Sequence, residues 1–392
     1  MDITYFLKLM NDKNASDLFL STGAPVNIKI SGVLAPLGTT PMPTGLAKRI
    51  AYSMMDENQV VRFERDLEMN LVTQLKDVGR FRVNIFRQRG EIGLVIRAIK
   101  ATVPSIEELQ LPLVLKDLIM EPRGLLLVVG STGSGKSTTL AAMIDYRNRQ
   151  RSGHILTIED PIEFVHDHNR SIVDQREVGI DTDSYADALK NAMREAPDVI
   201  MIGEIRDRET MEQALLYAET GQLCLATLHS NNASQTLDRI LAFFPAEAHG
   251  QVLQDLALNL KAVLSQRLLR SAVGSRRVPA VELLLQTTFV SDLILKGEVG
   301  KLREAMKQGI DGGMLTFEES LLRLYRSGKI SLDEALENAD SRSDLSLRVR
   351  LSEPVSLELE QRQRLKIDQS AESTLAEPRA GWEEEAPSAR RL

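Results

Sequence analysis

The chain has 392 residues and an aliphatic-rich composition, with 43% hydrophobic, 26% charged and 4% aromatic residues. This length allows two domains of ordinary size, each with a core of its own. The single cysteine, Cys224, excludes an internal disulfide framework and a cysteine cage for zinc, and the net charge of −7 argues against a bulk nucleic-acid binder. The opening residues lack a secretory signal, and no apolar run approaches the ~18 residues of a membrane span. We therefore expect a cytoplasmic protein.

Residues 1–100 have the pattern of a small α+β domain. The expected elements, in chain order, are a helix at 5–14, a strand at 16–21, a hairpin at 25–37 that turns at Ser31-Gly32, a helical segment at 45–66, and strands at 69–75, 80–88 and 91–99. Residues 101–112 contain two prolines and few packing residues, so we expect a linker there, with a hinge near Pro104.

Residues 113–340 form a second expected domain, in which short apolar strands alternate with amphipathic helices. The strands are expected at 125–130, 154–160, 199–204 and 223–229. Fully apolar strands that alternate with helices indicate a parallel sheet covered on both faces, so the predicted fold class is α/β.

The last part of this second domain, from about residue 236, is predicted to be mostly helical. Helices are expected at 251–271 and 316–339, with a short strand at 279–286 between them. Beyond Asp340 the apolar periodicity fades and the chain becomes polar and charged, so residues 341–392 are expected to be a disordered tail.

A phosphate-binding loop is the strongest signal in the chain. Gly130, Gly135, Lys136 and Ser137 have the spacing G-x-x-x-x-G-K-S, directly after an apolar strand and before a helix. In such a loop the backbone N–H groups face the phosphates, the lysine neutralises the β- and γ-oxygens, and the Ser137 hydroxyl ligates Mg²⁺. The predicted nucleotide-binding residues are Gly130, Ser131, Thr132, Gly133, Ser134, Gly135, Lys136, Ser137 and Thr138.

Two further strands end in side chains suited to the same site. The strand at 199–204 ends in Glu204, which is expected to hold Mg²⁺ through water; the alternative is that Glu204 caps the following helix. The strand at 223–229 ends in His229, where ligands of α/β proteins bind, and a role in sensing the γ-phosphate is plausible there.

Residues 156–168 carry Glu159, Asp160, Glu163, Asp167, His166 and His168. Because the strand in this segment ends at the same sheet edge, either Glu159 or Glu163 is placed to orient the water that attacks the γ-phosphate. His166 and His168 suggest a transition-metal site, but two histidines two residues apart rarely make one without a third convergent ligand. A solvated polar loop at 165–169 is the favoured alternative.

Together these motifs resemble the type IV pilus retraction ATPases of the secretion ATPase superfamily. The resemblance covers about residues 1–340 and is carried by "GSTGSGKSTTLA", "TIEDPIEFVH", "APDVIMIGEIRD" and "TGQLCLATLHSNNA". These look like the family's Walker A, Asp box, Walker B and His box. The resemblance implies a PAS-like N-terminal domain and a RecA-like ATPase domain, with Glu163 as the catalytic glutamate, Glu204 as the Walker B acid and His229 as the His-box histidine.

The resemblance also implies an assembly and its partners. Family members are homo-hexameric rings in which arginines of the N-terminal domain act in trans on the neighbour's ATP. Arg80, Arg82, Arg87 and Arg97 are the candidates here, Arg82 and Arg97 the preferred pair. Within the family the chain resembles the PilU type more than the PilT type, which implies work beside a PilT-type motor and a pilus platform protein at the inner-membrane face.

Three alternatives remain at this point. The first is a nucleotide-binding coupling ring that regulates a PilT-type motor with little hydrolysis of its own, and the second is a PilT-type primary retraction motor. A nucleic-acid translocase would need a basic central channel and salt-sensitive DNA binding.

Overall fold

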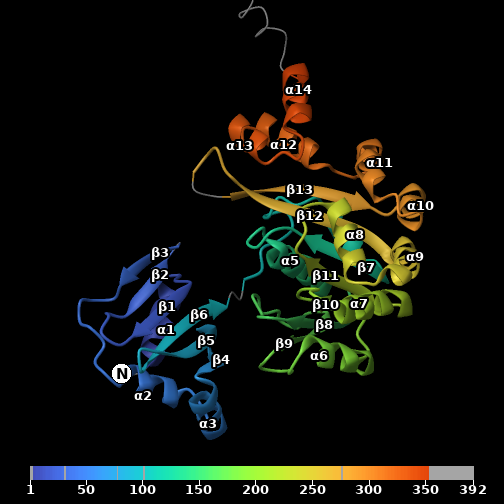
Figure 1. Ribbon diagram of the computed structural model, residues 1–392. Coiled ribbons are helices and arrows are strands. Elements are labelled where there is room, and N and C mark those ends of the chain that lie inside the picture. The colour runs from blue at the N-terminus through green and yellow to red at the C-terminus, as the bar shows by residue number, and fades with distance from the viewer. Residues whose placement is uncertain (1–2, 31, 77, 100–101, 275–276, 353–392) are drawn as a thin grey trace, which may run out of the picture.

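The computed structural model describes residues 3–30, 32–76, 78–99, 102–274 and 277–352. These residues form two sheets, one on either side of residues 100–101 (Figure 1). The N-terminal sheet is antiparallel, with the strand order β3-β2-β1-β6-β5-β4. Its strands are β1 (Asp17–Ser21), β2 (Asn27–Ile30), β3 (Val33–Pro36), β4 (Glu68–Leu75), β5 (Gly79–Gln88) and β6 (Glu91–Ile99).

The N-terminal helices close the core of this sheet, and the expected α+β domain is confirmed. They are α1 (Ile3–Asp12), α2 (Leu46–Ser53) and α3 (Glu57–Asp66). Their buried residues, such as Met10, Ile50 and Phe63, pack with inward-facing strand residues. The single helical segment expected at 45–66 is wrong, because Asp56 and Gln59 form a capping box that starts a new helix.

The second sheet has the strand order β13-β12-β7-β11-β10-β8-β9. Its strands are parallel except for β13, which pairs antiparallel with β12. The bounds are β7 (Gly124–Val129), β8 (Gly153–Glu159), β9 (Ser171–Glu177), β10 (Val199–Ile202), β11 (Leu223–Leu228), β12 (Leu260–Arg270) and β13 (Arg277–Leu285). The predicted parallel sheet is therefore confirmed, with an antiparallel edge strand added.

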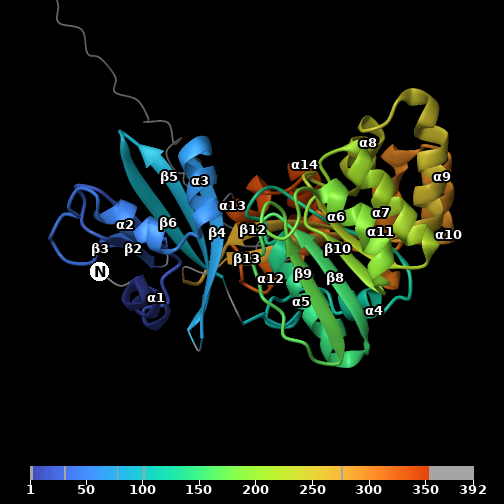
Figure 2. The ribbon, with the colours of Figure 1, turned by 90° about the horizontal axis from the view of Figure 1, so that it is seen from below.

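Helices cover both faces of this sheet, as fully apolar strands require. One face packs against α4 (Leu115–Ile119) and α5 (Lys136–Gln150). The other packs against α6 (Tyr185–Ala192), α7 (Arg208–Thr220), α8 (Ala233–Ala242), α9 (His249–Asn259), α10 (Thr288–Leu295) and α11 (Leu302–Gln308). Figure 2 shows the strands of the sheet between these groups of helices. Since β7, β8, β10 and β11 are parallel, their carboxyl ends meet at one edge.

Two strands differ from the sequence prediction. Residues 260–270 were expected to be helical, but they form β12, between β7 and β13. Both faces of β12 are buried, so its apolar residues do not alternate and their spacing imitates a helix. The strand β9 was not predicted at all, because its sequence SIVDQRE is largely polar. Its side chains nevertheless contact the loop that follows β8, as described below.

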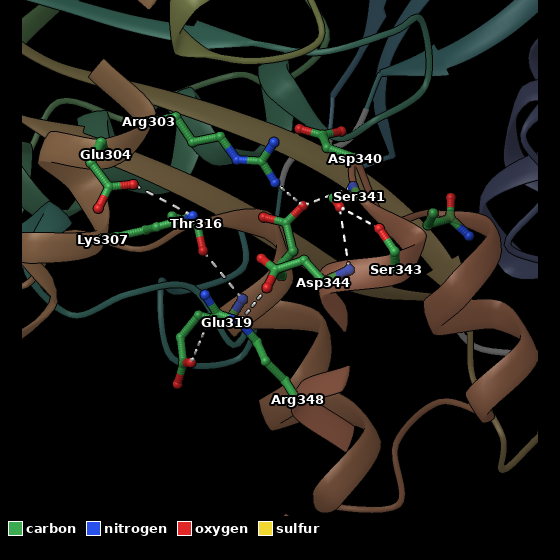
Figure 3. Close-up of polar contacts among 12 residues, drawn as sticks. Arg303, Glu304, Lys307, Thr316, Glu319, Asp340, Ser341, Ser343, Asp344 and Arg348 are labelled. Atoms are coloured by element: carbon green, nitrogen blue, oxygen red, sulfur yellow. Dashed lines mark hydrogen bonds and ion pairs between the residues drawn. The ribbon is translucent and has the colours of Figure 1, made fainter. Parts of the chain in front are cut away.

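The C-terminal part corrects the prediction that the tail is disordered from residue 341. Helices α12 (Phe317–Arg326), α13 (Leu332–Glu337) and α14 (Arg342–Ser352) form a small apolar cluster with residues of β12 and β13, in which Leu345 of α14 is fully buried. Arg348 of α14 lies 3.3 Å from Asp344 and 3.8 Å from Glu319 of α12 (Figure 3). Residues 353–392, the rest of the expected tail, lie outside the described residues.

The segment expected to be a linker also packs more than predicted. Ile106 and Leu111 are buried and join the core on the α4–α5 face of the sheet. Within the described part of the chain, no helix combines the length and the apolarity that crossing a membrane would need.

Candidate active site

The loop between β7 and α5 packs closely against the Ser134 side chain within it and against β12. Gly130 has a φ of +150°, and a Cβ there would lie 2.5 Å from both the Gln266 carbonyl oxygen and Ser134 Oγ. Gly135 also has a positive φ and stands at the N-terminus of α5. Only glycine is accommodated at position 130, because both the close neighbours and the positive φ exclude a side chain. The predicted phosphate loop is thus formed in the structure, and it leads into the N-terminus of α5, where anions bind.

Lys136 points back across this loop. Its Nζ donates to the carbonyl oxygens of Gly130, at 2.9 Å, and Ser131, at 3.2 Å. Partial burial lowers the pKa of Lys136, while the carboxylates of Glu204 and Glu163 raise it. The ammonium group is therefore held over the loop and faces the acidic side of the site.

A cavity of about 500 Å³ lies against the loop. Of the predicted loop residues, Thr132, Gly133, Gly135, Lys136, Ser137 and Thr138 line it. Ser134 lies on the other side of the loop, where it lines a separate 210 Å³ cavity together with Gln266. Glu163, Glu204 and His229 all line the larger cavity, so the structure brings together groups from four different loops. A hydroxyl at Ser137 and a carboxylate at Glu204 are the oxygen donors that suit Mg²⁺.

Glu204 and His229 are in direct contact. Glu204 Oε1 lies 2.8 Å from His229 Nε2, and Glu204 Oε2 lies 2.7 Å from an Arg206 nitrogen. Arg206 also approaches Asp160, at 3.8 Å. The helix cap that follows is Asp207, which accepts the N–H of Thr210, so Glu204 does not serve as the cap.

The acidic segment after β8 divides into buried and exposed groups. Glu163 is exposed at the cavity, whereas Glu159 is 8% exposed. Burial raises the pKa of Glu159 to about 7, although Thr157 and Gln175 donate hydrogen bonds to its carboxylate. Of the two acids, Glu163 is therefore the one that is accessible from the cavity.

The expected solvated loop at 165–169 is only partly correct. His166 is buried, and burial lowers its pKa to about 4, so it is neutral. His168 is exposed and its Nδ1 accepts the Val173 N–H. Among the residues that the structure describes, no group of three or more His, Cys, Asp or Glu side chains is arranged to hold a metal ion.

Tyr185, at the start of α6, lines the cavity and was not singled out from the sequence. Its hydroxyl lies 2.7 Å from where a Cβ on Gly203 would be, which explains the glycine before Glu204. Burial raises its pKa, and the charges of Asp160 and Arg206 also act on it. Sequence alone offers no signal for it, because Tyr185 follows an ordinary helix cap at Ser184.

The N-terminal arginines lie outside the cavity of their own chain. Arg97 pairs with Asp17 at 2.7 Å, and Arg82 lies opposite Arg97 in the β5–β6 register. Arg82 Nε is 3.9 Å from Glu177 Oε1 at the end of β9, and Arg87 pairs with Glu64. Arg82, Arg87 and Arg97 thus each have an acidic neighbour within the same chain.

Comparison with known proteins shows the family to which the chain belongs. The family model for Type II/IV secretion system protein matches residues 2–322. The type IV pilus ATPase PilU of Pseudomonas aeruginosa is 49% identical over 351 residues, with 90% of this chain and 92% of PilU covered. The type IV pilus retraction ATPase PilT of the same organism is 42% identical, with 86% and 98% covered.

The crystal structure of the pilus retraction motor PilT with bound ADP has the same fold, with a TM-score of 0.83 at 41% identity. The match covers 88% of this chain and 99% of the PilT chain. The chain therefore belongs to the Type II/IV secretion system protein family, as a P-loop ATPase of the PilT/PilU group.

Proposed function

We propose that this ATPase forms a homo-hexameric ring and helps to power type IV pilus retraction beside a PilT-type motor. The observation that carries the proposal is the single cavity at which Lys136, Glu163, Glu204 and His229 meet, in a chain 49% identical to PilU. A residue set suited to hydrolysis favours a working motor over a passive ring. The ring would act at the cytoplasmic face of the inner membrane, on a pilus platform protein.

Nucleotide binding would use the loop at 130–138. The backbone N–H groups of the loop and the N-terminus of α5 would hold the phosphates, and Lys136 would exchange its carbonyl partners for phosphate oxygens. Ser137 and Glu204 would hold Mg²⁺, directly and through water, and the ion would offset the negative charge of the phosphates.

Hydrolysis would depend on Glu163. Its carboxylate is exposed at the cavity that the phosphate loop lines, so it would orient and deprotonate the attacking water. Glu159 and Asp160 support this segment rather than replace Glu163, because Glu159 is buried with its pKa near 7. His229, paired with Glu204, would report the state of the γ-phosphate to the rest of the chain.

Arg82 and Arg97 would contribute to the neighbouring subunit's site. In one chain they contact Glu177 and Asp17, so a role in trans requires that they exchange these partners as the ring closes. Closure of the N-terminal sheet about the segment near Pro104 would make that exchange, as in other hinge-closing enzymes.

The decisive experiment compares ATP turnover of the purified protein with that of Glu163→Gln and Lys136→Ala. Loss of turnover in both variants is expected. If Glu163→Gln retains full turnover, the assignment of the catalytic base is wrong.

A second experiment separates the motor from a coupling ring. A strain without this gene is complemented with wild type or Lys136→Ala, and pilus retraction under load is scored. We expect restoration by wild type alone. Restoration by Lys136→Ala would favour the coupling ring, and retraction without any PilT-type partner would favour a primary motor.

A further inference from the structure

The loop that carries Glu163 is held by side chains of β9. Gln175 Oε1 accepts the His166 N–H at 2.8 Å, and Gln175 Nε2 donates to the Phe164 carbonyl oxygen at 2.9 Å. Glu177 Oε2 accepts the Ile162 N–H at 3.3 Å. Residues two apart on a strand share a face, so Gln175 and Glu177 reach the loop together. They fix the backbone on both sides of Glu163.

The burial pattern of the loop agrees with this arrangement. Ile162, Phe164 and His166 are buried, whereas Glu163 between them is exposed at the cavity. The alternate residues anchor the loop while Glu163 projects from it. A shift of the anchors would therefore move the Glu163 carboxylate relative to the nucleotide.

We propose that Gln175 and Glu177 are positioning residues for hydrolysis, and that Arg82 of the N-terminal sheet acts on the Glu163 loop through Glu177. The inference rests on the proposed role of Glu163 and extends it. Neither Gln175 nor Glu177 contacts the nucleotide site: both act through the loop backbone, and neither lines the cavity.

Glu177 is suited to receive a signal from the N-terminal domain. Its side chain is 1% exposed, its Oε2 holds Ile162, and its Oε1 has no hydrogen-bond partner. Oε1 faces Arg82 at 3.9 Å. Burial raises the pKa of Glu177, and the charges of Arg82 and Arg80 offset part of this effect. The charge of Asp181 also raises the pKa of Glu177, and its Oδ2 accepts the Glu177 N–H.

A separation of 3.9 Å is too long for a hydrogen bond and short enough for strong attraction. A movement of β5 toward β9 by about an ångström would complete the ion pair, since N⁺–H···O⁻ bonds measure roughly 2.7–2.9 Å. Withdrawal of β5 would leave a buried carboxylate without its cation, which is costly and would disturb the bond to Ile162. The position of the N-terminal sheet is thus coupled to the loop that bears Glu163.

The test uses the assembled full-length ring and separates kcat from nucleotide affinity. Gln175→Met removes the hydrogen bonds to the loop at similar volume, and Glu177→Gln removes the charge but keeps an acceptor for Ile162. We expect kcat to fall about tenfold in each, since a misplacement of about 1 Å costs up to ~100-fold. The dissociation constant of a fluorescent ATP analogue should change less than about twofold, because the phosphate loop is untouched.

A matched control lies between the two residues on the same strand. Arg176 projects to the opposite face and pairs with Glu195 at 3.0 Å, so Arg176→Gln should leave kcat within about twofold. Thermal unfolding and the mass of the ring are measured for every variant. If Glu177→Gln does not assemble, Glu177→Asp takes its place in both the single and the double variant, because it keeps the charge but shortens the reach to Ile162 and Arg82.

The double variant Arg82→Gln/Glu177→Gln tests the coupling. If Arg82 and Glu177 act as one unit, the kcat of the double variant should be no lower than that of the less active single variant. If the fold-losses in kcat of the two single variants multiply in the double variant, the coupling is wrong and Arg82 acts in trans only. Unchanged kcat in Gln175→Met and Glu177→Gln, with Glu163→Gln inactive, would overturn the positioning role. Activity in Glu163→Gln would instead overturn the proposed function itself.

Discussion

The two loops that face each other across the cavity are held in place by different means. The phosphate loop is built from consecutive residues, with Lys136 bonded to Gly130 and Ser131 and with Gly130 packed on Ser134. The Glu163 loop is held by Gln175 and Glu177, which belong to a different strand. The phosphate loop is stabilised by contacts among its own residues, so it keeps its conformation when the N-terminal domain moves. The Glu163 loop is stabilised by side chains of β9, so it moves when that strand moves.

This difference suits the chemistry proposed for each loop. Binding of phosphate needs a fixed cradle, because anion affinity depends on several N–H groups pointing at one place. Hydrolysis in a ring motor must wait for the neighbouring subunit, so its base benefits from a support that senses domain position. The predictions below test this contrast.

The largest expected effect is that of Lys136→Ala. Removal of the ammonium group leaves the γ-phosphate without its cation, and ATP turnover should fall by ~100-fold or more. Steady-state ATPase assays measure the effect. Lys296→Ala, which removes an exposed lysine paired with Asp292 on α10, is the control and should keep wild-type turnover. Equal losses of ATP turnover in both variants would mean that turnover depends on the overall charge of the protein and not on the phosphate loop.

Glu159→Gln should change how stability depends on pH. The pKa of Glu159 is raised to about 7 in the folded chain from an ordinary value of 4.5, so the folded state binds the extra proton between these values. Stability of the wild type therefore falls as pH rises from about 4.5 to about 7. Gln keeps the acceptor for Thr157 and Gln175 without the charge.

Accordingly, Glu159→Gln should be more stable than wild type at pH 8, by as much as ~3 kcal/mol, and nearly equal to it at pH 4.5. Thermal unfolding of both proteins at the two pH values measures this. A gain that is the same at both pH values would show that Glu159 does not titrate as a buried acid.

Gly130→Ala should damage the phosphate loop. Its Cβ would lie 2.5 Å from Ser134 Oγ within the loop and 2.5 Å from the Gln266 carbonyl oxygen of β12, so the free energy of unfolding should fall by ~2 kcal/mol, and nucleotide affinity should fall with it. Urea unfolding and fluorescent-nucleotide titration measure both. Gly250→Ala, in α9 with open space around its Cβ position, should be neutral or slightly stabilising. Normal nucleotide binding by Gly130→Ala would contradict the tight loop geometry.

The smallest expected effect is that of Tyr185→Phe. The ring would still fill its place beside Gly203, but the hydroxyl that faces Asp160 and Arg206 would be lost. We expect kcat to fall about threefold, the size of one modest polar contact. Tyr5→Phe, exposed on α1, is the control. A loss as large as that of Lys136→Ala would place Tyr185 among the catalytic groups.

Much of the fold and the site could be predicted because it is encoded over short stretches. The apolar runs at 125–130, 199–204 and 223–229 each specify a buried strand, and the glycines of 130–135 specify the turn that follows. Because parallel strands end at one edge, Lys136, Glu204 and His229 had to meet there. The sequence by itself therefore determined the central parallel strands of the ATPase sheet and the groups at their carboxyl ends.

The tertiary structure decided what depends on contacts between distant residues. It placed the polar segment 171–177 at the sheet edge, turned 260–270 from an expected helix into β12, and folded α14 onto α12. It also buried Glu159 and set Arg82 opposite Glu177. Burial and electrostatic partners are properties of the packed chain, since the free energy of a charge depends on what surrounds it in space rather than in sequence.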